Sequence, residues 1–231
     1  MKISGITKFT LIDFPEKVSC IIFTAGCNFR CGYCHNSEYV LPEKLKNISL
    51  IPEKAVFNFL EKRKGLLEGV SICGGEPTIH KDLPTFCKKV KDIGYSIKLD
   101  TNGQNPKMIK QLLDNKVIDY IAMDIKNPVG EFAKIVGTNV NEKHYLESIE
   151  LIKNSNINHE FRTTVIKGIH NNEKIEKIAK YIRGAKNYNL QNYKSGDTLN
   201  PTFEGKSFSE QELIILKKLA QKYVNNVKIK S

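Results

Sequence analysis

Short apolar runs of strand length alternate with longer amphipathic stretches over almost the whole chain, and this alternation restricts the possible folds more than any other feature. The expected strands are rich in Val, Ile, Leu or aromatic residues: Val18–Thr24, Gly69–Cys73, Tyr95–Asp100, Asp119–Asp124, His159–Val165 and Tyr188–Tyr193. The expected helices follow them: Pro52–Lys64, Leu83–Ile93, Pro106–Asn115, Glu142–Asn154, Asn172–Arg183 and Ser209–Tyr223. Because a helix separates successive strands, the strands are predicted to be parallel and covered by helices.

The two ends of the chain extend this pattern. Lys2–Asp13 is expected to be a short extended lead-in, and Val224–Lys230 is a candidate for a last strand. No linker rich in Pro, Gly or Ser divides the sequence, so we expect a single domain over residues 1–231. A parallel α/β chain of this kind forms either an open doubly wound sheet or a barrel.

Polar residues follow the expected strands at their carboxyl ends. They are Gly26 and Cys27 after the first strand, Gly74-Gly75-Glu76 after the second, Asp100 at the third, and Asp124 and Lys126 at the fourth. In an open sheet and in a barrel alike, this edge of parallel strands forms the site. The glycines would let a ligand approach the backbone, whose carbonyls can accept hydrogen bonds from an ammonium group.

Composition excludes several classes of protein. Apolar residues make up 40% and charged residues 26% of the chain, which rules out disorder, and no apolar run is long enough to span a bilayer. The amino terminus lacks the apolar stretch of a signal peptide, so a cytoplasmic location without membrane attachment is expected.

The chain is strongly basic. Lys and Arg number 36 against 25 Asp and Glu, which gives a net charge of +11. Only Arg30, Arg63, Arg162 and Arg183 are arginines, and the lysines lie along helix-like stretches without interleaved aromatic residues, so nucleic-acid binding is not expected. The charge predicts a solvated lysine-rich surface or a docking face for an acidic partner.

Three cysteines, Cys27, Cys31 and Cys34, share one glycine-bearing loop after the first strand. Three thiolates can hold a soft metal centre and leave one coordination position open, which is the arrangement of a reactive site. Cys31–His35 also matches the haem-attachment pattern, but that modification usually accompanies export. Structural zinc, with His35 or Cys20 as a further ligand, remains an alternative. Thiols buried only as small apolar groups would not explain the spacing, which favours an iron–sulfur cluster.

The spacing Cys-x₃-Cys-x₂-Cys, with Tyr33 before the last cysteine and Gly-Gly-Glu after the next strand, resembles the radical S-adenosylmethionine (SAM) enzymes. The resemblance covers nearly the entire chain. It implies that Cys27, Cys31 and Cys34 hold a 4Fe-4S cluster whose remaining iron chelates SAM. It also implies an α/β fold, a partial (β/α)6 TIM-type barrel with parallel strands that is open on one side. Cys20, Cys73 and Cys87 are then expected to be structural.

Two further segments, Asp100-Thr101-Asn102-Gly103 and Asp124-Ile125-Lys126, are similar to those of the glycyl-radical-enzyme activating enzymes, as is Cys-His-Asn after the triplet. The resemblance implies contacts to SAM or to a monovalent cation from ten residues: Tyr33, His35, Gly74, Gly75, Glu76, Asp100, Asn102, Asp124, Lys126 and Arg162. The alternative role for Arg162 is a charge paired with one of the aspartates. A further contact to SAM, at the end of the expected strand Tyr188–Tyr193, is assigned to either Gln191 or Lys194.

The implied activity is reductive cleavage of SAM and removal of a hydrogen atom from a glycine of a partner enzyme. The segment LQNYKSGDTLNP resembles activating proteins of anaerobic ribonucleotide reductase, which makes that reductase the expected partner. A flavodoxin or ferredoxin would supply the electron. The alternatives are a pyruvate formate-lyase type activating enzyme, a radical SAM enzyme acting on a small molecule, and a non-enzymatic iron–sulfur electron carrier.

Overall fold

The computed structural model describes residues 1–230, and no helix in that range is long and apolar enough to cross a membrane. The chain forms two compact units. The first consists of Met1–Asn28, Asn36–Thr101 and Lys107–Ile121; the second consists of Phe29–His35, Asn102–Pro106 and the chain from Ala122 onward. The expected single domain therefore stays a prediction.

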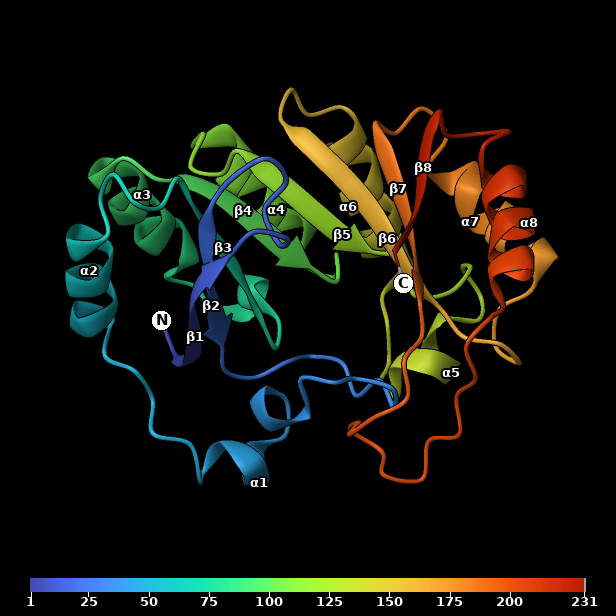
Figure 1. The fold of residues 1–231 in the computed structure, drawn as a ribbon, viewed down its shortest axis with the longest axis horizontal. Helices are drawn as coiled ribbons and strands as arrows, with labels where there is room; N and C mark the ends of the chain where they lie inside the picture. The colour runs from blue at the N-terminus through green and yellow to red at the C-terminus, as the bar shows by residue number, and fades with distance from the viewer. Residues whose placement is uncertain (231) are drawn as a thin grey trace. The chain divides into compact units, whose positions relative to one another are not determined.

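Eight strands are hydrogen-bonded in chain order: β1 (Ile3–Thr10), β2 (Ser19–Thr24), β3 (Gly69–Gly74), β4 (Ser96–Thr101), β5 (Tyr120–Asp124), β6 (Asn158–Val165), β7 (Asn187–Asn192) and β8 (Asn226–Lys230) (Figure 1). The pairs β2–β3, β3–β4, β6–β7 and β7–β8 are parallel, as the alternating pattern predicts. β1 and β8 are the edges, so the sheet is not closed. The predicted mostly parallel, open α/β fold is confirmed.

The expected lead-in is itself a strand. β1 pairs antiparallel with β2, with Ile6 opposite Ile22. A two-strand hairpin of this kind needs only the short connection that residues 11–18 provide, whereas parallel neighbours need a crossover. The candidate last strand is present as β8.

All six predicted helices are present, within a few residues at their ends: α2 (Glu53–Lys62), α3 (Leu83–Ile93), α4 (Pro106–Asp114), α6 (Glu142–Lys153), α7 (Asn172–Tyr181) and α8 (Glu210–Ala220). Four short helices were not predicted: η1 (Ser37–Tyr39), α1 (Pro42–Leu45), η2 (Pro77–Ile79) and α5 (Phe132–Val136). None of the four is long enough to display a helical repeat of apolar residues.

The core of the first unit comes from one face of its strands. Parallel register places Cys20, Val70 and Ile97 in one row across the three strands, and Ile22, Ile72 and Leu99 in another. All six side chains are buried, and α2 and α3 contribute Leu60 and Phe86 to the same core. The opposite face carries polar groups, because Ser71 pairs there with Lys98.

The second unit repeats this division between an apolar and a polar face. Phe161, Tyr188 and Val227 are neighbours in register and are buried. α7 and α8 lie beside β7 and β8 (Figure 1). On the other face, Arg162 lies beside Asn189, which lies beside Lys228. One face of these strands thus forms the core and the other presents polar groups.

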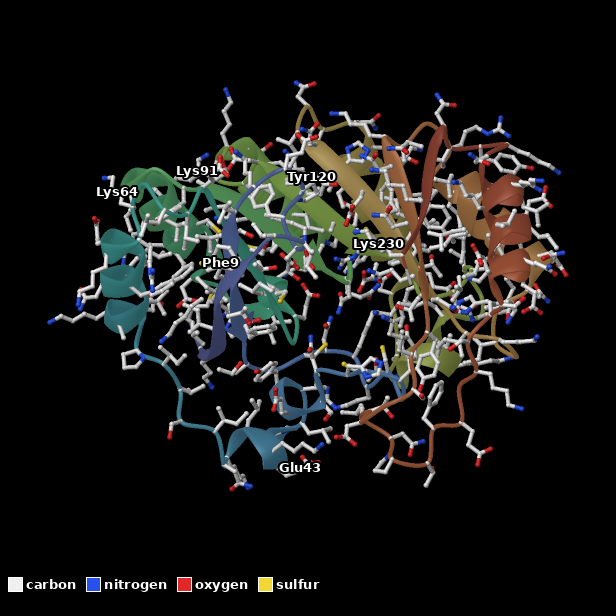
Figure 2. All side chains as sticks on the ribbon, in the orientation of Figure 1. Phe9, Glu43, Lys64, Lys91, Tyr120 and Lys230 are labelled. Atoms are coloured by element: carbon white, nitrogen blue, oxygen red, sulfur yellow. The ribbon has the colours of Figure 1, made fainter. Side chains whose placement is uncertain are left out.

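Many charged side chains project from the ribbon, among them Glu43 and Lys64, which are exposed (Figure 2). Phe9 on β1 is also 59% exposed. The charged groups agree with a solvated lysine-rich surface.

α8 begins at a capping box. The Ser209 hydroxyl accepts a hydrogen bond from the Glu212 amide at 3.3 Å, and the Glu212 carboxylate accepts one from the Ser209 amide at 2.8 Å.

We predict that Ser209→Ala lowers the free energy of unfolding by about 1 kcal/mol, because an amide of the first helical turn loses its acceptor. Urea denaturation measures the loss, and thermal melting is expected to show a decrease of roughly 2–4 °C per kcal/mol. Ser209→Asp keeps an acceptor at this position and is the matched control. Equal stability of the alanine and aspartate variants would contradict the capping role.

Candidate active site

Cys31 and Cys34 lie on one turn of the cysteine loop, Phe29–His35, in the second unit. The Cys34 amide donates to the Cys31 carbonyl at 3.0 Å. Cys31 is buried and Cys34 is half-buried. Burial raises the pKa of the Cys31 thiol to about 11, and the positive charge of Lys126 acts in the opposite direction. A metal that binds here would displace the thiol proton.

Cys27 belongs to the first unit, in the stretch that follows β2, and its side chain is half-buried. Its Sγ lies 4.0 Å from the Asn28 side-chain oxygen. Among residues 1–230, no three His, Cys, Asp or Glu side chains are gathered closely enough to hold a metal ion. In donor chemistry the three cysteines fit an iron–sulfur cluster, which takes soft thiolate ligands. Their assignment as ligands stays a prediction.

Gly74, the last residue of β3, and Gly75, which follows it, serve close backbone packing in the first unit. Gly74 has φ +109°, and a Cβ there would lie 2.3 Å from the Thr24 amide nitrogen. A Cβ on Gly75 would lie 1.9 Å from the Gly26 carbonyl oxygen. A side chain at position 75 would therefore collide with backbone, and a contact from Gly74 or Gly75 to SAM stays a prediction. Only glycine permits this approach.

Glu76 is almost fully buried, with 1% of its surface exposed. Its Oε1 accepts hydrogen bonds from the Thr78 amide at 3.0 Å, the Thr78 hydroxyl at 2.5 Å and the Thr101 hydroxyl at 2.8 Å. Glu76 thus joins η2 to the end of β4. A contact from Glu76 to SAM remains a prediction.

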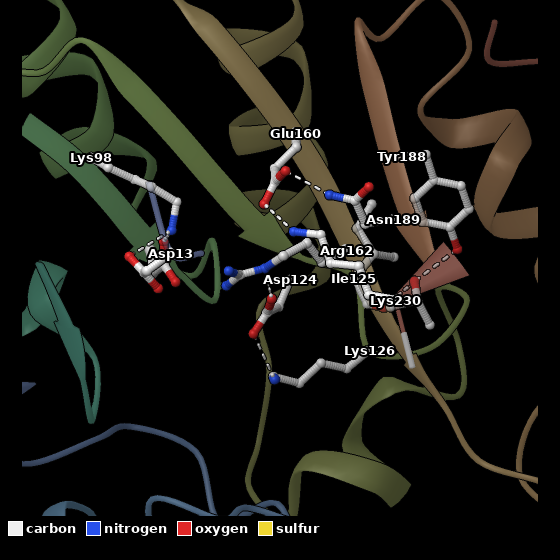
Figure 3. A network of polar contacts seen from close by, with 12 residues as sticks. Asp13, Lys98, Asp124, Ile125, Lys126, Glu160, Arg162, Tyr188, Asn189 and Lys230 are labelled. Atoms are coloured by element: carbon white, nitrogen blue, oxygen red, sulfur yellow. Dashed lines mark hydrogen bonds and ion pairs between the residues drawn. The ribbon is translucent and has the colours of Figure 1, made fainter. Parts of the chain in front are cut away.

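Asp100 and Asn102 both have partners within the protein. Lys98 is buried on the polar face of the first unit and forms ion pairs with Asp100 and, at 3.5 Å, with Asp13 (Figure 3). Asn102, in the second unit, accepts a hydrogen bond from the Gln104 amide at 3.1 Å and so stabilises a turn.

Asp124 lies between two cations in the second unit (Figure 3). The Arg162 Nε donates to one carboxylate oxygen at 2.8 Å, and the Lys126 Nζ donates to the other at 3.2 Å. The alternative role of Arg162, a charge paired with an aspartate, is confirmed. Burial alone would raise the pKa of Asp124, but the charges of Arg162 and Lys126 outweigh burial and lower it to about 2. The carboxylate is therefore ionised at neutral pH.

The backbone of the Asp124–Lys126 segment is held by three side chains that the sequence did not identify. Tyr145 donates to the Asp124 carbonyl, Thr163 to the Ile125 carbonyl and His170 to the Lys126 carbonyl, at 3.2, 2.7 and 3.0 Å. Burial lowers the pKa of His170 to about 4, so its ring is neutral at pH 7. Its Nδ1 accepts from the Ile166 amide, which leaves the proton on Nε2.

Tyr33 and His35 are tied to other parts of the second unit. The Lys126 ammonium lies 5.7 Å from the centre of the Tyr33 ring. The His35 ring stacks on Tyr193 at 6.0 Å, and its Nδ1 lies 3.2 Å from the Asp197 carbonyl oxygen. Lys194 is exposed. The choice between Gln191 and Lys194 as a SAM contact stays open.

We predict that Arg162→Met destabilises the protein by roughly 1.5–3 kcal/mol at pH 6.5, because Asp124 loses a charged hydrogen bond. The pKa of Asp124 is about 2 in the folded state and roughly 3.9 in an unfolded chain, so its stabilising effect is complete above pH 4 and is lost as pH falls toward 2. The difference from wild type should therefore shrink below pH 4. Urea denaturation at pH 6.5, 4 and 3 measures it.

The matched control is Arg63→Met, because Arg63 is exposed. Arg63→Met should change the free energy of unfolding little at any of these pH values. If Arg162→Met lowers the free energy of unfolding by the same amount down to pH 3, the carboxylate of Asp124 is not the group that Arg162 stabilises.

Comparison with known proteins places the chain in a family. The profile of the Radical SAM superfamily matches residues 21–182. A protein of Methanocaldococcus jannaschii, whose name gives glycyl-radical enzyme activation as an inferred function, is 34% identical over 99% of this chain and 95% of its own length. The pyruvate formate-lyase-activating enzyme of Clostridium pasteurianum is 26% identical over 80% of this chain and 78% of its own.

Among solved structures, Streptococcus suis SuiB bound to its precursor peptide SuiA superposes with a TM-score of 0.72 at 17% identity. The match covers 91% of this chain and 48% of SuiB, and at this identity it concerns the fold alone. The profile match and the full-length similarity carry the classification, which in turn implies a 4Fe-4S cluster and SAM. The chain belongs to the radical SAM superfamily and, within it, to the family of glycyl-radical-enzyme activating enzymes.

Proposed function

We propose that this protein activates an anaerobic ribonucleotide reductase by removing a hydrogen atom from one glycine of that enzyme. The observation that carries the activating role is the similarity to the M. jannaschii protein over 99% of the chain. The reductase as partner rests on the LQNYKSGDTLNP segment, in residues 190–201. Glycine suits the reaction because no side chain obstructs the approach to its α-hydrogen.

In this proposal Cys27, Cys31 and Cys34 hold the cluster, and the open fourth position takes SAM. When bound and reduced, these groups together supply a carbon-centred radical that abstracts the hydrogen atom. The protein contributes binding and orientation, and no general base is required. A flavodoxin or ferredoxin is the proposed electron donor, and the net charge of +11 favours association with an acidic protein of that kind.

In this proposal Asp124, Lys126 and Arg162 provide charges of both signs for the amino-acid part of SAM. Arg162 and Asp124 are joined at 2.8 Å, whereas Lys126 reaches Asp124 at 3.2 Å. If the Lys126 ammonium turned toward a ligand carboxylate, Asp124 would keep its shorter ion pair with Arg162. We therefore propose Lys126 as the cation that binds the SAM carboxylate.

The remaining proposed contacts to SAM rest on sequence resemblance. They come from Tyr33, His35, Gly74, Gly75, Glu76, Asp100 and Asn102. A monovalent cation belongs to the same proposal.

A pyruvate formate-lyase type enzyme is the second candidate partner. The C. pasteurianum activating enzyme is similar over 80% of this chain, which favours it over a small-molecule substrate.

We predict that the anaerobically reconstituted protein binds about four iron and four sulfide per chain. Each of the single substitutions Cys27→Ala, Cys31→Ala and Cys34→Ala should abolish cluster binding, because three thiolates are needed. Iron and sulfide assays with visible absorption measure this. Cys87→Ala is the matched control, since Cys87 lies fully buried in α3. Cluster loss in the control, or zinc in place of iron, would refute the ligand assignment.

We also predict that the reduced protein with SAM generates a glycyl radical on anaerobic ribonucleotide reductase, visible as a doublet in electron paramagnetic resonance. A pyruvate formate-lyase homologue is assayed in parallel to decide between the two partners. The Cys31→Ala variant serves as the control and should give no signal. Cleavage of SAM without a signal on either partner would replace this proposal with a reaction on a small molecule.

A further inference from the structure

The segment Lys194–Gly205, which we name the strap, lies against the cysteine loop within the second unit. Two backbone hydrogen bonds join them: the Leu199 amide donates to the Cys34 carbonyl at 2.9 Å, and the Asn200 amide donates to the Gly32 carbonyl at 3.0 Å. The strap therefore pairs directly with the turn that carries Cys31 and Cys34.

Aromatic rings add to this attachment. The Phe203 ring of the strap lies 5.9 Å from that of Tyr33 and 5.7 Å from that of Tyr193, measured between centres. At the other end of the loop, the stacked His35 also reaches the strap through the Asp197 carbonyl. Both sides of Cys34 are thus held by the strap and by Tyr193.

The strap fits closely over Gly32. A Cβ on Gly32 would lie 3.3 Å from the Phe203 ring and 3.5 Å from the Asn200 Cβ. This close packing leaves the loop little freedom to change conformation while the strap is in place.

The conformation of the strap depends on Asn200. Its side-chain oxygen accepts from the Thr202 amide at 3.1 Å and from the Thr202 hydroxyl at 2.9 Å. Its carbonyl accepts from the Thr198 hydroxyl at 2.8 Å and from the Phe203 amide at 3.0 Å. These bonds form a compact turn that fixes the direction of the Asn200 amide toward Gly32.

We propose that the strap holds the Cys31–Cys34 turn in the conformation that receives the cluster, and that Asn200 is its positioning residue. The inference rests on the proposed cluster ligands. Ordering a loop when a ligand binds costs free energy, so a loop that is already ordered retains its ligand more tightly. Long irregular segments inside compact proteins are uncommon and usually functional, which agrees with this role.

The test uses Asn200→Ala, which removes the side-chain acceptor but keeps the backbone amide. In the metal-free protein, hydrogen–deuterium exchange of residues 31–36 should accelerate on the order of ten-fold, because local opening becomes easier. In the reconstituted protein, release of iron to a chelator should accelerate by a similar factor. Asn200→Asp keeps the acceptor oxygen and should restore both rates.

Two further variants complete the experiment. Phe203→Ala removes the ring contact to Tyr33 and should also accelerate both hydrogen–deuterium exchange and iron release. Asn156→Ala is the matched control at an exposed residue and should leave both rates unchanged. Thermal melting confirms that each variant is folded.

The proposal is overturned if Asn200→Ala and Phe203→Ala both leave exchange and iron release at wild-type values. It is also overturned if Asn200→Asp behaves like the alanine variant. If the wild-type protein takes up no iron, the proposed cluster fails. Exchange in the metal-free protein still decides whether the strap holds the loop.

Discussion

The ion pair between Asp124 and Arg162 determines how the polar face of the second unit is organised. Burial disfavours the charged form of a carboxylate, and for Asp124 the charges of Arg162 and Lys126 more than offset that effect. Arg162 extends from β6 and Asp124 from β5, so the pair joins two neighbouring strands. With this charge satisfied, Lys126 can lie close to the Tyr33 ring of the cysteine loop.

Much of the fold could be predicted because its signals are local. β5 is a nearly continuous run of apolar residues, and α3 ends where Gly94 adopts a positive φ of 110°, as expected of a glycine after a helix. α5 escaped prediction because Phe132–Val136 is too short to show a periodic pattern. β1 was expected only as an extended lead-in, because its antiparallel pairing depends on where β2 lies.

The site was predictable in its residue types but not in its connections. Motifs single out Asp124 and Arg162, and opposite charge suggests that they pair. His170 could not be identified, since a lone histidine in a loop carries no sign of the carbonyl it binds. The contact between the strap and the cysteine loop could not be predicted, because Leu199 and Cys34 are far apart in sequence and meet only through tertiary packing.

The contact of Gly75 with Gly26 has a mechanical consequence. Backbone atoms in contact cannot yield as a flexible side chain can, so a displacement of one segment is transmitted to the other. A side chain at position 75 would therefore push the carbonyl of Gly26, the residue preceding Cys27, out of place. Replacing Gly75 would in this way displace the chain just before Cys27 without altering any cysteine.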